Sequence, residues 1–130
     1  MSARGDLRTP LKRARGLGAS KTGTGHFLWQ RVTAVALALL GAYLLGLLFS
    51  LGGSDFGRAR ALVAQPFNAT VLATVLVAMF WHAKLGLQVV IEDYVHTPVL
   101  AGVTHLTNIF ACTLAAVAGV LAVVRIALGA

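Results

Sequence analysis

Three long apolar stretches dominate the chain. The first covers residues 32–51 and contains no charged residue. The second covers residues 69–91 with only a few polar side chains, and the third lies within residues 100–128. A helix that crosses a bilayer needs about 20 mostly apolar residues, because each residue advances about 1.5 Å along the helix axis. The pattern therefore predicts an all-α integral membrane protein with three transmembrane helices, at about 30–52, 67–92 and 100–126.

Helices are the expected spanning form because backbone groups inside hydrocarbon must all pair within the protein. The first apolar stretch has 20 residues, whereas the core of a secretory signal peptide has about 7–15 residues. We therefore expect this stretch to remain in the protein as a membrane helix.

Basic residues are concentrated before the first apolar stretch. Seven of the eleven Lys and Arg residues lie at or before residue 31. Because segments on the cytoplasmic side of a membrane carry an excess of Lys and Arg, we expect the N-terminus to lie inside. The predicted organisation is a basic cytoplasmic tail, residues 1–26, followed by a three-helix anchor, residues 27–130. The tail carries no base-reading motif, so lipid headgroups are expected partners and nucleic acid is not.

The second apolar stretch contains His82 and Lys84, two residues that are costly inside a membrane. His82 precedes Ile91 by nine residues, which places it about 13–14 Å deep and near the bilayer midplane. Spacing alone leaves three interpretations of the imidazole open. It can bond a neighbouring helix, relay protons or bind substrate, or act as an axial ligand of heme iron. Gly86, one turn further on, would leave room for a flat group beside His82.

Other polar residues of the second and third helices have separate expected roles. A six-coordinate heme needs a second ligand, from His105 or from another chain. Lys84 points about 200° away from His82 around the helix, so it does not share the face of His82. Three alternatives stay open for Lys84: it snorkels poorly toward the membrane surface, pairs with a polar group of a neighbouring helix, or lies in a wet crevice. We expect Gln88 to form an interhelical hydrogen bond. The single Cys112 excludes an internal disulfide and is expected to be a packing residue.

Two segments of the chain resemble a known family. Residues 82–95, with the pattern H-x3-G-x-Q-V-x3-D-Y-V, resemble the second helix of the small membrane-anchor subunit of succinate dehydrogenase, or complex II. Residues 20–34 begin with S-K-T-G-T-G-H and end with Q-R-V-T-A, and they are similar to the start of that family's first helix. The resemblance extends over roughly residues 10–128 and implies an anchor built as a bundle of helices from several subunits.

The resemblance also implies a role for individual residues. His82 matches an axial ligand of heme b, and is thus the residue that would bind the heme iron. Arg31 matches an arginine near the heme propionates, and His26 is matched to a propionate-side histidine. Tyr94 matches the tyrosine that hydrogen-bonds a quinone carbonyl oxygen, and Asp93 matches its acidic neighbour.

Partners and location follow from the same resemblance. It implies that heme b is shared with a second cytochrome b anchor subunit, while a flavoprotein and an iron–sulfur subunit oxidise succinate and reduce ubiquinone or a similar quinone. The chain would then be no enzyme on its own, with no catalytic residue, and would lie in a bacterial inner membrane rather than a mitochondrial one. Two alternatives stay open: a small proton-coupled transporter subunit, weakened by the absence of an inverted repeat, and a heme-free structural anchor.

Overall fold

The computed structural model describes residue 11 and residues 23–129 of the chain. Three helices in it are long and apolar enough to cross a membrane: α2 (Gly23–Ser50), α4 (Pro66–Tyr94) and α5 (Pro98–Ala127). The part described contains no strand, so the prediction of an all-α chain with three candidate membrane spans is confirmed. Most of the predicted tail, up to residue 22, lies outside the described residues apart from residue 11.

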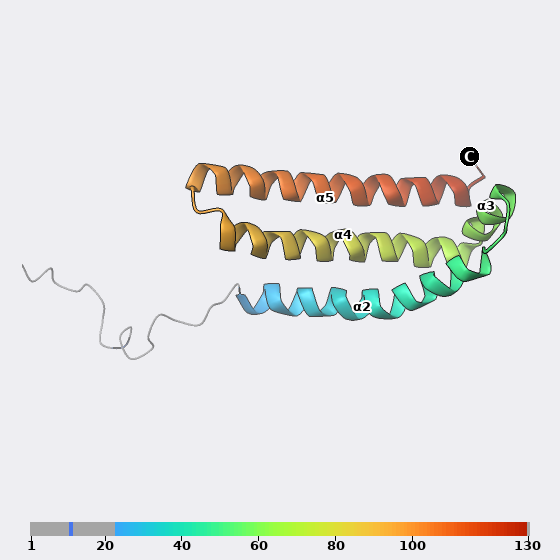
Figure 1. The fold of residues 1–130 in the computed structure, drawn as a ribbon, viewed down its shortest axis with the longest axis horizontal. Helices are drawn as coiled ribbons and strands as arrows, with labels where there is room; N and C mark the ends of the chain where they lie inside the picture. Colours follow the sequence, from blue (N-terminus) through green and yellow to red (C-terminus); the bar gives the residue numbers. More distant parts are fainter. Residues whose placement is uncertain (1–10, 12–22, 130) are drawn as a thin grey trace, which may run out of the picture.

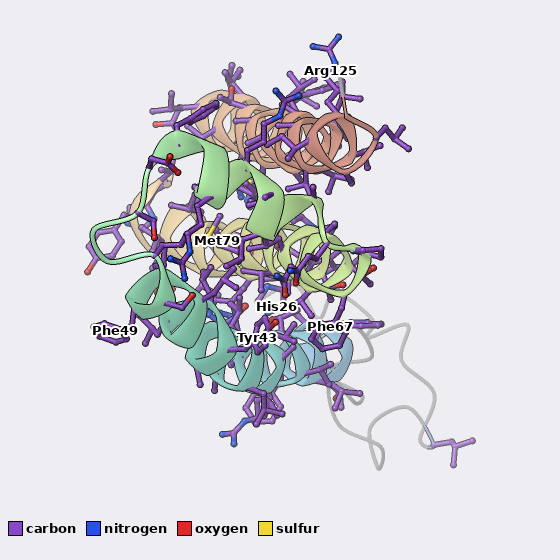
Figure 2. The ribbon with its side chains drawn as sticks, turned by 90° about the vertical axis from the view of Figure 1, so that its right-hand side faces the viewer. His26, Tyr43, Phe49, Phe67, Met79 and Arg125 are labelled. Carbon is purple, nitrogen blue, oxygen red and sulfur yellow. The ribbon has the colours of Figure 1, made fainter. Side chains whose placement is uncertain are left out.

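The three long helices lie side by side in one layer (Figure 1). The middle helix, α4, packs against α2 on one side and against α5 on the other, whereas α2 and α5 do not touch within the described residues. A view turned by 90° shows the same order of α5, α4 and α2 (Figure 2). The start of α2, the end of α4 and the start of α5 therefore share one end of the layer.

The layer has almost no hydrophobic core of its own. Among the described apolar residues only Ala69, Val75 and Leu85 are buried, and no large side chain is fully buried. A water-soluble domain of this size would bury most of its large apolar side chains. The exposed apolar faces therefore suit contact with lipid or with other membrane helices.

The ends of the helices are set by local sequence. Pro66 and Pro98 stand at the first positions of α4 and α5, where a missing backbone N–H costs nothing. Gly53 has a φ of 75° in the turn after α2, which a glycine adopts without strain. The short helix α3 (Phe56–Ala64) follows, and the carboxylate of Asp55 caps it by accepting the N–H of Arg58 at 2.8 Å.

The structure differs from the sequence prediction at two points, the start of the first helix and the presence of α3. The first helix begins at Gly23 and not near residue 30, because the polar and aromatic residues before the apolar stretch continue the same helix. The helix α3 was not predicted, because its nine residues are too few to give a clear hydrophobic period. It lies at the far end of the layer against α4 and α5 (Figure 1).

A buried asparagine joins three helices at that far end. Asn68 of α4 is only 4% exposed. Its amide group donates hydrogen bonds to the backbone oxygen of Leu62 in α3 at 2.7 Å and to the side-chain oxygen of Gln65 at 3.1 Å. The hydroxyl of Tyr43 in α2 donates to the asparagine oxygen, and the Tyr43 ring packs edge to face on Phe67 with centroids 5.6 Å apart (Figure 2). This cluster joins α2 and α3 to the start of α4.

We predict that Asn68→Leu lowers the stability of the assembled protein by about 1–3 kcal/mol, because it leaves buried donors and acceptors without partners. The midpoint of thermal unfolding of the purified membrane complex measures this. Ser50→Ala is the matched control, since Ser50 is exposed and bonds only the Leu47 oxygen of its own helix. Equal midpoints for the two variants would contradict the prediction.

Candidate functional site

A stripe of three polar residues runs along the first helix on the side that faces α4. His26, Gln30 and Thr33 are spaced by four and three residues, which places them on one face of α2. Thr33 is buried, and His26 and Gln30 are half-buried. Such a stripe in an apolar helix indicates contact with another polar group, and the facing residue on α4 is His82.

His82 lies near the middle of α4, about 18 Å along the axis from Tyr94. Its Nδ1 is 2.9 Å from the hydroxyl oxygen of Thr33, and its Nε2 is 3.4 Å from the amide nitrogen of Gln30. One ring nitrogen therefore bonds a neighbouring helix, which was one of the three interpretations of His82. The other nitrogen has only a long contact with a side chain that can rotate away.

Two further buried atoms of the stripe have no hydrogen-bond partner among the described residues: Nε2 of His26 and the amide oxygen of Gln30. An unsatisfied buried polar atom costs about 1–3 kcal/mol. A Cβ atom added to Gly86 would meet only the Gln30 amide nitrogen, at an ordinary 3.7 Å, so packing within this chain does not require a glycine there. His82 can ligate a metal, and His26 and Gln30 have buried atoms that lack a hydrogen-bond partner. Together with the open position at Gly86, they fit a flat group such as heme that comes from outside the chain.

Arg31 lies outside the interface between α2 and α4. Its side chain is exposed, and its guanidinium carbon is 4.4 Å from the centre of the Phe27 ring. On the neighbouring positions, Trp29 and Trp81 pack with ring centroids 5.7 Å apart, which adds an aromatic contact between α2 and α4. The described chain therefore does not bring Arg31 to His26, although both lie near the start of α2.

The predicted quinone residues stand at the end of α4. Asp93 is exposed and Tyr94 is 79% exposed, and neither side chain has a hydrogen-bond partner within the part of the chain that is described. Gln88 donates to Glu92 of the same helix at 2.9 Å, so the prediction of an interhelical bond for Gln88 is wrong. The pair forms because residues four apart on a helix are neighbours. Asp93 and Tyr94 are left available to a ligand or partner.

Lys84 faces the opposite side of α4 from His82. It lines a groove of about 260 Å³ between α4 and α5 whose other lining residues are mostly apolar, and the three alternatives for Lys84 stay predictions. The backbone oxygen of Lys84 accepts a hydrogen bond from the buried Asn108 of α5 at 2.9 Å. Cys112 also lines the groove and donates to the Asn108 side-chain oxygen at 3.4 Å. The remaining lining residues are Val77, Phe80, Trp81, Ile109, Thr113, Ala116 and Val117.

His105 is not brought to His82. It belongs to α5, which packs on α4 without touching α2, whereas the His82 ring contacts α2. The described residues contain no cluster of three or more His, Cys, Asp or Glu side chains able to hold a metal ion. The sequence pattern predicted no role for Gln30 or Thr33. Their helical spacing from His26 was the available signal.

Comparison with known proteins gives a consistent result. A family profile described as "Succinate dehydrogenase/Fumarate reductase transmembrane subunit" matches residues 5–124. The "Succinate dehydrogenase hydrophobic membrane anchor subunit" of Rickettsia typhi is 30% identical over 91% of this chain and 94% of its own length. The protein of the same name from Rickettsia bellii is 36% identical over 69% of this chain and 72% of its own. The "Succinate dehydrogenase membrane anchor subunit" of Reclinomonas americana is 31% identical over 59% and 67% respectively. No solved structure matches the chain.

Proposed function

Because the chain belongs to the succinate dehydrogenase/fumarate reductase transmembrane subunit family, we propose that it holds heme b and forms part of a quinone-reduction site. The chain is a membrane-anchor subunit of succinate dehydrogenase. This membership replaces the transporter hypothesis. The proposed partners are a flavoprotein subunit, an iron–sulfur subunit and a second anchor subunit, in the inner membrane of a bacterium.

The heme proposal rests on the hydrogen bonds of the two ring nitrogens of His82. One ring nitrogen is bonded to Thr33, and the other is turned toward Gln30 with no strong partner. We assign Nε2 of His82 as the atom that would hold the iron once the Gln30 amide turned away, and Gly86 as the position that would leave space for the heme. When bound, heme supplies a one-electron redox centre within the span.

A further ligand of the iron would come from the second anchor subunit, because the His82 ring contacts α2 whereas His105 belongs to α5, which does not touch α2. The orphaned Nε2 of His26 is suited to hydrogen-bond a propionate. Arg31 provides a planar donor fork that can leave its exposed contact with Phe27 and pair with a propionate. A heme-free structural anchor would give these polar atoms no reason to be buried without partners.

The quinone site is proposed at the end of α4. The hydroxyl of Tyr94 donates a hydrogen bond to a quinone carbonyl oxygen, and the carboxyl of Asp93 passes a proton to the reduced oxygen. Both side chains are exposed. The end of α4 that carries them lies at the end of the layer where α2 begins (Figure 1). With the basic N-terminus on the inner side, this end faces the cytoplasm, where the peripheral subunits would dock.

We predict that His82→Ala in the complete complex abolishes the reduced b-type heme band. The difference spectrum of the reduced and oxidised purified complex measures this, with subunit content checked by gel. His105→Ala is the matched control and should retain the band, because His105 belongs to a helix that does not touch α2. An unchanged band in His82→Ala would refute the ligand assignment.

We predict that Tyr94→Phe lowers quinone reduction by succinate about tenfold, the contribution of one hydrogen bond to bound substrate. Succinate oxidation by an artificial dye should remain, because the dye takes electrons before the quinone site. Tyr43→Phe is the control for the same chemical change, since Tyr43 bonds Asn68 at the opposite end of the layer. Loss of both activities in Tyr94→Phe would point to assembly and against a quinone contact.

A further inference from the structure

We infer that Thr33 is a positioning residue for the heme ligand: its hydroxyl oxygen accepts the Nδ1–H of His82 and so keeps Nε2 deprotonated toward the iron. This inference rests on the proposed heme ligation and adds to it a residue on a different helix. Neither the family resemblance nor the sequence pattern assigned a function to Thr33.

The Thr33 hydroxyl has a single proton to donate. Its oxygen lies 2.8 Å from the backbone oxygen of Trp29 and 3.1 Å from that of Gln30, and 2.9 Å from Nδ1 of His82. Carbonyl oxygens only accept hydrogen bonds. If the hydroxyl proton went to His82, two short oxygen–oxygen contacts would remain with no proton between them. The hydroxyl therefore donates to its own helix, and its oxygen accepts a proton from the imidazole.

A proton on Nδ1 fixes the tautomer of a neutral imidazole. Nε2 then carries a lone pair, which is the form that binds a metal. The Gln30 amide nitrogen at 3.4 Å is a donor and agrees with a bare Nε2. The contact with Gln30 is long, and its amide group can rotate by half a turn. The assignment of the His82 tautomer therefore depends on Thr33.

Thr33 also fixes the direction of the ring. It is only 7% exposed, and its bond to the preceding turn of α2 holds its hydroxyl in place. A β-branched side chain in a helix has few rotamers, so the acceptor is rigid. Hydrogen bonding to the far nitrogen of a metal-bound histidine orients the ring and makes it more basic. Greater basicity favours the oxidised metal, so Thr33 should lower the midpoint potential of the heme.

The test replaces Thr33 in the whole complex. Thr33→Val keeps the shape of the side chain and removes the acceptor. We expect about a tenfold or larger loss of heme affinity, as for other partners of metal-bound histidines, and an upward shift of the midpoint potential of the heme that stays bound. Heme content per complex during detergent dilution and a redox titration of the b band measure these effects.

Two comparisons isolate the hydroxyl. Thr33→Ser should keep the heme content and the midpoint potential of the wild-type complex. Thr33→Ala, whose side chain differs from that of the serine variant by one oxygen, should not. If Thr33→Val fails to assemble, the Ser and Ala pair decides the question. Thr104→Val is the matched control, because Thr104 bonds the backbone oxygens of Leu100 and Ala101 at 2.8 and 3.0 Å in the same way. It should leave the heme unchanged.

The outcomes separate this inference from the heme proposal. A b band that survives His82→Ala would overturn both. Loss of the band in His82→Ala with wild-type heme content and potential in Thr33→Val would overturn only the role of Thr33. Equal defects in the Ser and Ala variants would assign the effect to packing and would also overturn it.

Discussion

The arrangement depends on one constraint: a polar group buried in a membrane needs a hydrogen-bond partner, and a group that its own helix cannot satisfy must find one on a neighbouring element. The layer has almost no apolar core, so a few polar contacts locate α4 between its neighbours. On one side His82 meets Thr33 of α2 at 2.9 Å. On the other side Asn108 of α5 donates to the backbone oxygen of Lys84, also at 2.9 Å. Both outer helices are thus fixed against the same turn of α4.

This shared turn explains how His82 and Lys84 coexist in an apolar stretch. Residues two apart on a helix point about 200° from each other, so the two side chains serve opposite sides of α4. His82 is directed to the polar stripe of α2, whereas Lys84 lines the groove against α5. The charge of Lys84 is therefore kept away from the proposed heme, where a cation would otherwise change the potential. A polar residue in a membrane helix is interpretable only when its direction is known.

The fold could be predicted from hydropathy because hydrocarbon thickness sets the length of each span. The ends of α4 and α5 lie close to the predicted ones for that reason. The start of α2 was misjudged because a helix can extend beyond the hydrocarbon, where hydropathy gives no signal. The single-layer arrangement could not be predicted, because three amphiphilic patterns this weak do not say which helices touch. Contact of α2 and α5 with α4, and not with each other, is information from the structure.

Part of the candidate site could be predicted from the sequence and part could not. His82 was recognisable because an imidazole is rare and costly at mid-membrane depth. Thr33 was not, because a threonine in a membrane helix normally bonds its own backbone, as Thr70 and Thr74 do at 2.8 Å. Thr33 donates that same bond, and what distinguishes it is the imidazole 2.9 Å from its hydroxyl oxygen. Sequence patterns identify residue types that are rare in their surroundings, such as an imidazole within a membrane span. The role proposed for Thr33 depends on the helix that faces it, and only the packing of α2 on α4 reveals that contact.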